Sequence, residues 1–93
     1  MLSKIPIDIE KIKAEDIDKE ILRAALIAEL DAINLYEEMA ALAKNEHIKT
    51  VLMEVAKEEK EHVGEFQTLL LMFDKEQVEE LEEGKEEVEE LIK

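Results

Sequence analysis

The feature that most constrains this chain is its lack of helix breakers, because its 93 residues contain two glycines and one proline. Gly and Pro are the residues that most often end helices and form turns, so their scarcity predicts long, uninterrupted helices. Pro6 limits any early helix to positions beyond it, and the isoleucines around it alternate along the chain. We therefore expect residues 1–15 to form an extended N-terminal arm.

Capping residues then divide the chain into long helices. The first is predicted over residues 16–45, with Asp16 or Asp18 as its N-cap. The second is predicted over residues 46–73, and Asn45 either ends the first helix or caps the second. Two helices of this length joined by a short loop are expected to fold back as an antiparallel hairpin.

A third, shorter helix is predicted over residues 74–93. Asp74 with Gln77 three positions later resembles a capping box that opens it, and Gly84 is expected to interrupt it. The predicted fold is thus all-α, with residues 1–93 forming a single domain: a two-helix hairpin plus a C-terminal helix. Because a hairpin alone leaves one apolar side of each helix exposed, we expect the chain to form oligomers.

The charge of the chain excludes several classes of partner. It carries 26 acidic and 12 basic residues, a formal net charge of −14, while 46% of its residues are hydrophobic. Nucleic acids and anionic membrane surfaces require basic footprints, so neither is expected as a partner. The absence of cysteine excludes disulfide frameworks and thiolate chemistry. With no apolar stretch long enough for a signal or a membrane span, we expect a cytoplasmic protein.

Each predicted long helix carries an apolar stripe that is interrupted by polar residues. At steps of three and four, the stripe of the first helix is continuous only if Glu29 is included, and that of the second only if Glu59 and His62 are included. The apolar members of the two stripes are Leu22, Ala25, Ala32, Tyr36, Met39 and Ala43, followed by Leu52, Val55, Phe66, Leu69 and Phe73. Two carboxylates and one imidazole therefore lie where packing favours hydrocarbon.

A bound cation explains these polar positions best. Burying an ionised carboxylate without compensation costs several kcal/mol, and Arg23 and the nearby lysines lie mostly off the stripe. Oxygen and imidazole ligands without thiolate suit iron or manganese, with zinc possible. The Glu-x-x-His motif of Glu59 and His62 is weak alone in a chain so rich in Glu, and it gains weight from the stripe position of Glu29. The alternative is a coiled-coil hairpin whose polar stripe residues fix its register.

The three residues supply half of a known ligand set. Di-iron carboxylate bundles use a Glu from each of two helices and a Glu-x-x-His from each of the other two. Two copies of this chain related by a twofold axis would provide four glutamates and two histidines. Four carboxylates balance the charge of two divalent cations. The sequence thus predicts a homodimer that forms a four-helix bundle with a di-iron site shared between its chains.

The sequence resembles the encapsulated ferritins, two-helix members of the ferritin-like superfamily. The resemblance covers about residues 20–75 and is carried by the segments 29–36 (ELDAINLY) and 58–62 (EEKEH). It implies a ferroxidase in which Glu29, Glu59 and His62 ligate iron, with Tyr36 close to the centre. Family members oxidise two Fe(II) ions together with dioxygen, form rings of dimers, and work as cargo inside an encapsulin shell where iron is stored.

The chain departs from the family pattern in two places. Relatives carry further acids that guide incoming metal; Asp31 matches one of these, whereas Ala28 stands where another is expected. Glu58 lies just outside the stripe and is a candidate for supporting or replacing a ligand. Residues 89–93 do not resemble a shell-targeting peptide, so we expect the chain to be either truncated or a piece of a fusion with the shell protein. The competing functions are a non-catalytic Zn or Mn module and a structural coiled-coil hairpin.

Overall fold

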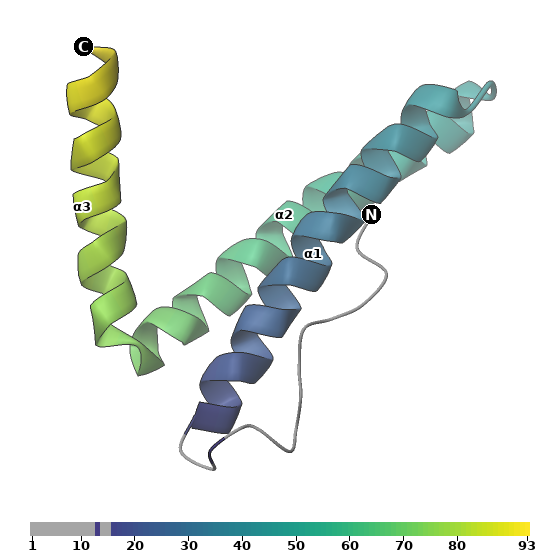
Figure 1. Ribbon diagram of the computed structural model, residues 1–93. Coiled ribbons are helices and arrows are strands. Elements are labelled where there is room, and N and C mark those ends of the chain that lie inside the picture. The colour runs from purple at the N-terminus through teal and green to yellow at the C-terminus, as the bar shows by residue number, and fades with distance from the viewer. Residues whose placement is uncertain (1–12, 14–15) are drawn as a thin grey trace.

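The structure is a computed structural model that describes residue 13 and residues 16–93. The described chain forms three helices: α1 (Ile17–Leu42), α2 (Glu46–Phe73) and α3 (Lys75–Ile92). As Figure 1 shows, α1 and α2 lie side by side in opposite directions, and α3 leaves the far end of α2 at an angle. The predicted all-α hairpin with a third helix is confirmed. The predicted arm over residues 1–15 lies outside the described residues, except for residue 13.

The tip of the hairpin is built by Asn45. Its side-chain Oδ1 accepts hydrogen bonds from the backbone N–H groups of His47 (2.9 Å) and Ile48 (3.1 Å), so it caps α2. The sequence left open whether Asn45 ends one helix or begins the next. The backbone already leaves the helical region at Ala43 (φ −65°, ψ 142°), so α1 ends at Leu42, before the predicted boundary at residue 45.

Two further details differ from the sequence pattern. Asp16 occupies the N-cap position of α1, yet its side chain makes no capping hydrogen bond and instead lies 3.9 Å from Lys19 Nζ. The prediction that Gly84 interrupts the last helix is wrong, because α3 continues through it from Lys75 to Ile92. One glycine costs a helix only about 1 kcal/mol relative to alanine, and its Glu-rich neighbours are good helix formers.

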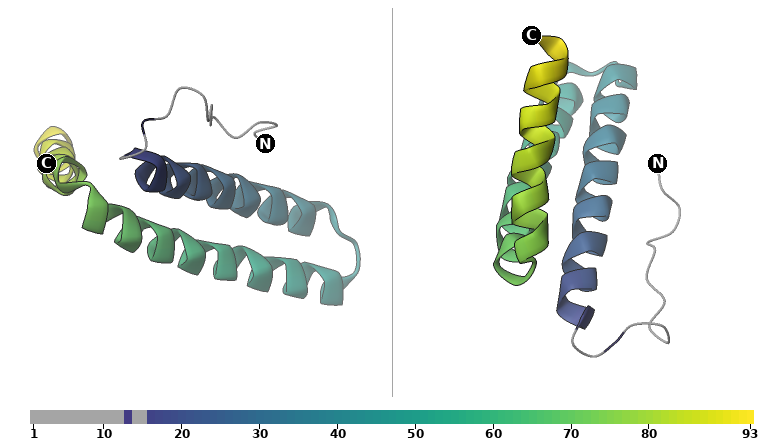
Figure 2. Two further views of the ribbon diagram at one scale, coloured as in Figure 1. Left: turned by 90° about the horizontal axis from the view of Figure 1, so that it is seen from below. Right: turned by 60° about the vertical axis from the view of Figure 1, so that its left-hand side comes forward.

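The interior of the hairpin is thin. It is formed by Ile33 and Ala40 of α1 with Ala56 and Leu70 of α2, all of which are buried. The two positions on each helix are seven and fourteen residues apart, close to whole numbers of turns, so each pair shares one face. Small alanine side chains allow the two helix axes to approach closely. The view from below in Figure 2 shows that α1 and α2 form a single layer of two helices.

The predicted stripe borders this interior and does not form it. At 3.6 residues per turn, the stripe face is rotated by roughly 60–90° from the buried face of each helix. Phe66 is half-buried, whereas Leu69 and Phe73 remain 44% and 58% exposed. The stripe therefore presents large apolar side chains to the outside of the single hairpin.

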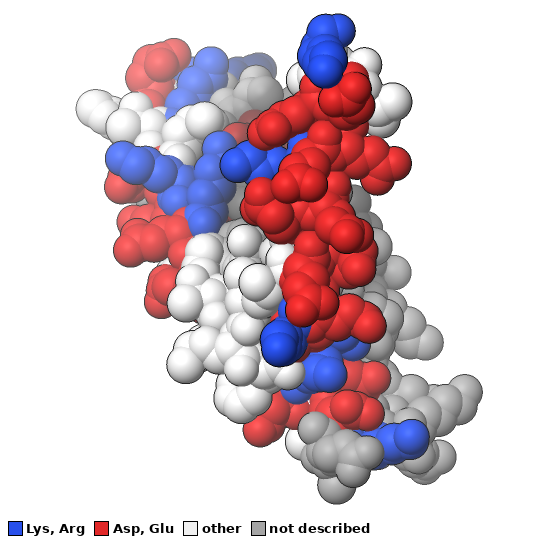
Figure 3. All heavy atoms as spheres, turned by 90° about the vertical axis from the view of Figure 1, so that its left-hand side faces the viewer, with Lys and Arg blue, Asp and Glu red and all other residues white. Residues whose placement is uncertain are grey.

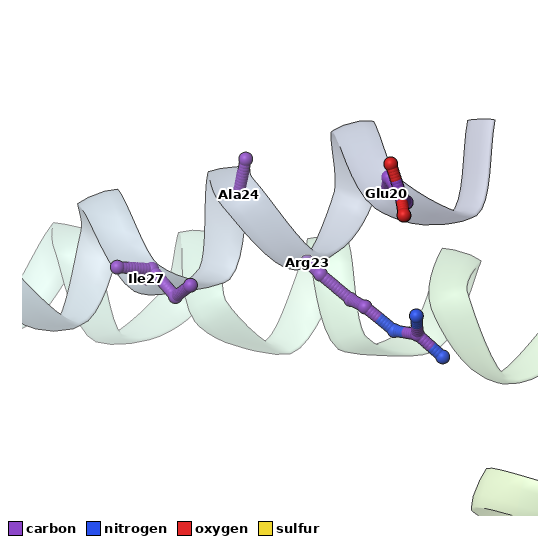
Figure 4. Close-up of a pocket in the computed structure, with 4 residues that line it drawn as sticks. All are labelled: Glu20, Arg23, Ala24 and Ile27. Carbon is purple, nitrogen blue, oxygen red and sulfur yellow. The ribbon is translucent and has the colours of Figure 1, made fainter. Parts of the chain in front are cut away.

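Asp74 joins all three helices at the corner between α2 and α3. It is the one charged side chain that is buried among the described residues, with 7% of its surface exposed. One carboxylate oxygen accepts the backbone N–H of Gln77 at 3.0 Å and caps α3, as the sequence predicts. The other oxygen accepts from Arg23 of α1 at 2.8 Å. Figure 4 shows the Arg23 side chain extending away from α1, beside a small pocket that it lines with Glu20, Ala24 and Ile27.

These contacts predict a specific pH dependence. The backbone hydrogen bond from Gln77 and the side-chain hydrogen bond from Arg23 lower the pKa of Asp74 despite its burial. Because the folded pKa is depressed, the carboxylate stabilises the fold at neutral pH, and this contribution is lost as pH falls through the folded pKa, below about pH 4. We expect thermal unfolding of Asp74→Asn, in which the cap can persist without the ion pair, to be less sensitive to pH in this range. The exposed Glu82→Gln variant should keep the parent slope, and a parent slope in Asp74→Asn would contradict the assignment.

Helix α3 carries a concentration of negative charge. It contains nine glutamates and two lysines, which give it a net charge of −7. This is half of the net charge of the whole chain, −14. Figure 3 shows these acids as a nearly continuous column along the helix. Repulsion from Glu83, one turn further on, raises the pKa of Glu80. The helix contacts the hairpin only at the end of α2, so most of its surface is exposed. The exposed surface includes its apolar side chains, Val78, Leu81, Val88, Leu91 and Ile92.

Candidate metal centre

The middle of the hairpin holds a cluster of three side chains that could ligate a metal. Glu29 comes from α1, and Glu59 and His62 come from one turn of α2. One potential ligand atom from each residue lies within 4.8 Å of the other two. Three positions of separation place Glu59 and His62 on the same side of α2, and the antiparallel pairing brings Glu29 beside them. The cluster therefore depends on both helices.

The imidazole is directed at both carboxylates. His62 Nδ1 lies 3.4 Å from Glu29 Oε2 and 3.4 Å from Glu59 Oε2. Ligand atoms about 2.1 Å from one metal ion, as in zinc sites, are separated from one another by about 3.0–3.4 Å for octahedral to tetrahedral angles. The observed separations match donors arranged around a cation. They are long for hydrogen bonds, which in proteins are usually near 2.9 Å.

One oxygen of the cluster has no hydrogen-bond partner. Glu29 Oε2 is buried, and among the described side-chain atoms it is the one that is both buried and unsatisfied. Nδ1 of His62 can donate a single hydrogen bond, so two carboxylates compete for one donor. An unsatisfied buried acceptor costs about 1–3 kcal/mol. The residues thus fit a cation, which would satisfy both carboxylates at once.

The basic side chains near the cluster are engaged elsewhere. Arg23 binds Asp74 at the corner, and Lys60 Nζ lies 3.4 Å from Glu37 Oε2 across the hairpin. Apart from His62, no ion-pair partner of Glu29 or Glu59 is present in the described part of the chain. The Glu29 and Glu59 side chains are 21% and 17% exposed, so solvent compensates their charges only in part. The arrangement favours a positively charged ligand.

The other predicted site residues lie outside this cluster. Tyr36 is half-buried on α1, two turns beyond Glu29 and on the same side of the helix. Asp31 is half-buried and Glu58 is exposed, and neither belongs to the group of three. Their predicted roles in catalysis, in guiding metal and in supporting a ligand remain predictions.

Sequence reasoning missed the ion pair between Glu37 and Lys60, which crosses the hairpin next to the cluster. Lys60 lies inside the Glu-x-x-His segment, between Glu59 and His62. Its position one residue after a ligand candidate places it on the neighbouring side of α2, facing α1. The position of Lys60 on this side of α2 was the signal in the sequence that it could pair with an acid of α1. That acid is Glu37.

The fold and the cluster together define a class: a helical hairpin with a carboxylate–histidine group suited to a metal. The model of the Rubrerythrin family matches residues 20–93 of this chain. The chain therefore belongs to the rubrerythrin family, and within it to the encapsulated ferritin-like domains. This confirms the resemblance found in the sequence.

One solved structure and two further proteins support this family assignment. The crystal structure of the encapsulated ferritin domain from Pyrococcus furiosus is similar over 99% of this chain and 94% of its own, with 51% identity and a TM-score of 0.84. A ferritin-like–encapsulin shell fusion protein from P. furiosus is 62% identical over 72 residues, which are 77% of this chain and 21% of the fusion. The encapsulin nanocompartment cargo protein EncC of Myxococcus xanthus is 43% identical over 56 residues, 60% of this chain and 43% of that protein. The chain thus spans about a fifth of the length of the fusion protein and less than half of the length of EncC.

None of the described helices combines the length and the apolar character needed to cross a bilayer.

Proposed function

We propose that this protein is a ferroxidase, which oxidises Fe(II) to Fe(III) with dioxygen at a site completed by a second copy of the chain. The observation that carries the proposal is the convergence of Glu29, Glu59 and His62, with a buried Glu29 oxygen that lacks a partner. Carboxylate oxygens favour Fe(III) over Fe(II), so these ligands promote loss of an electron. Membership of a ferritin-like family supports the same activity.

A second copy is needed because one hairpin supplies too few ligands. Three donors hold one metal incompletely, whereas di-iron bundles use four glutamates and two histidines. The stripe that carries the three donors also presents Leu69 and Phe73 outward, as expected of a face that another hairpin covers. Two Fe(II) ions held between two copies would supply two electrons, which with two protons reduce one dioxygen to hydrogen peroxide. No side chain needs to act as a nucleophile.

The protein is further proposed to form rings of such dimers and to act within an encapsulin compartment. The support comes from relatives: one is a fusion with an encapsulin shell and another is an encapsulin nanocompartment cargo protein. A half-bundle of this size has no interior that could hold mineral, so the ferric product is passed on for storage by the shell. The site would then lie in the cytoplasm, inside the compartment.

Aerobic addition of Fe(II) tests the proposal against its two competitors. A ferroxidase oxidises many equivalents of Fe(II) per chain, a non-catalytic Zn or Mn module binds at most a few ions, and a structural coiled coil does neither. We expect multiple turnovers, measured by the absorbance of Fe(III) and by oxygen consumption. Anomalous scattering at the iron edge should then locate the metal between two chains. Oxidation no faster than in buffer would refute the ferroxidase proposal.

A further inference from the structure

A shallow apolar pocket lies on α2 next to the hairpin tip. Its volume is about 340 Å³, and it is lined by His47, Ile48, Val51 and Leu52. Ile48 and Val51 are 53% and 61% exposed, so the pocket is open in the single chain. Steps of three and four connect Leu52 through Val55 to Glu59, which places this tip pocket on the same side of α2 as the metal cluster.

The opposite end of α2 carries large apolar side chains on this same side. Leu69 and Phe73 belong to the stripe of His62 and remain 44% and 58% exposed. An open apolar pocket and an exposed aromatic ring on one face are features of an association surface. They cannot meet within one chain, because residues 48 and 73 are separated by almost the whole length of a straight helix.

The pocket and the ring are placed symmetrically about the cluster. Ile48 lies as many positions before the midpoint of Glu59 and His62 as Phe73 lies after it. The same holds for Leu52 and Leu69. At 1.5 Å per residue, each outer pair lies about 19 Å from the midpoint along the helix.

A twofold axis through the metal cluster makes this symmetry meaningful. The inference rests on the proposed function, in which a second copy completes the site. An axis that lies between two hairpins and runs perpendicular to their helices makes each α2 face the α2 of the other copy in the opposite direction. In such an isologous contact, residue 48 of one chain faces residue 73 of the other, and residue 73 faces residue 48.

The charges on this face permit the contact. The face contains no lysine or arginine from Ile48 to Phe73, and its one acid, Glu59, lies in the middle. Metal held between the copies neutralises the centre, and the two ends are apolar. We propose that the tip pocket of each copy receives Phe73 of the other copy. We call this pair of contacts the clasp, and it sets the register in which the two half-sites meet.

Cross-linking tests the clasp directly, because the parent chain has no cysteine. The double variant Ile48→Cys/Phe73→Cys is treated with a short bifunctional thiol reagent, with Zn²⁺ as a redox-inert occupant of the site. We expect a closed covalent dimer that does not extend into a ladder. Ile48→Cys alone should give no covalent dimer, because the two copies of residue 48 would lie about 38 Å apart along the helices.

The control pair is Ile48→Cys/Met72→Cys. Met72 is more exposed than Phe73, at 73%, but lies on another side of α2, so this pair should not cross-link efficiently. Equal cross-linking of both pairs, or none with Phe73, would overturn the clasp. If the parent oxidises Fe(II) but the Phe73 pair fails, the clasp is wrong and the proposed function stands. If the Phe73 pair cross-links but Fe(II) is not oxidised, the proposed function fails and the clasp stands.

A second variant guards against perturbation by cysteine. Phe73→Ala removes two contacts per dimer and leaves all three candidate ligands in place. We expect its dimer dissociation constant, measured by sedimentation with Zn²⁺, to rise at least about tenfold, whereas Met72→Ala should leave it near the parent value. Equal dissociation constants for Phe73→Ala and the parent would contradict the clasp.

Discussion

Glu29→Gln is expected to lower the rate of Fe(II) oxidation by about 100-fold or more and, without metal, to leave the hairpin at least as stable as the parent. The amide keeps the size of the side chain but removes the negative charge that a metal requires. Changing a residue that merely supports a ligand already costs about 10–100-fold, so losing a ligand should cost more. At the same time the amide can place an N–H donor where the unpartnered carboxylate oxygen lies, next to Glu59, and so relieve the cost of about 1–3 kcal/mol of a buried polar atom without a partner.

The opposite signs of the two effects distinguish a metal ligand from a structural residue. Oxidation is followed by stopped-flow absorbance, and the free energy of unfolding by urea denaturation in the presence of a chelator. Glu61→Gln is the matched control, because Glu61 is exposed on α2 between the two ligand candidates of that helix. It should change neither quantity. Parent-like oxidation in Glu29→Gln would show that the site is wrongly assigned.

Ala56→Leu is expected to lower the free energy of unfolding by about 1–3 kcal/mol, the usual cost of overpacking a core. Only 1% of the Ala56 surface is exposed, so three additional carbon atoms must push α1 and α2 apart. Glu59 lies one turn further along α2, and Glu29 reaches it from α1. The variant should therefore also weaken Zn²⁺ binding, although it changes no ligand.

Calorimetric titration with Zn²⁺ and chelator-treated urea denaturation measure the two effects. Lys57→Leu introduces the same side chain at the next, exposed position and should leave both quantities close to those of the parent. If Ala56→Leu binds Zn²⁺ as tightly as the parent, the separation of the helices does not control the site.

Much of the fold follows from local rules that a sequence exposes. The range 46–73 predicted for the second helix coincides with α2, because Asn45 and Asp74 at its ends are strong capping residues. The stripe brought Glu29 into one group with Glu59 and His62, and the structure places their ligand atoms together. Periodicity could do this because it reports which residues share a side of a helix.

Other features depend on contacts that periodicity cannot reveal. The pairing of Arg23 with Asp74 joins positions 51 residues apart, and nothing local in the sequence links them. The stripe likewise could not tell the interior of one hairpin from the face that it turns outward, because both are apolar. Ala40 and Ala56 form part of the interior, and small residues of this kind give a weak pattern. Metal binding and dimer formation stay predictions.

The attachment of α3 has a consequence for how the molecule opens. The helix meets the hairpin at one corner, where a single buried carboxylate holds it through Gln77 and Arg23. In the single chain, we therefore expect α3 and the hairpin to open as two units with different opening free energies. Amide hydrogens of α3 should exchange with solvent well before those in the middle of α1 and α2. Slow exchange along α3 in the assembled protein would then report directly on the surfaces that cover it.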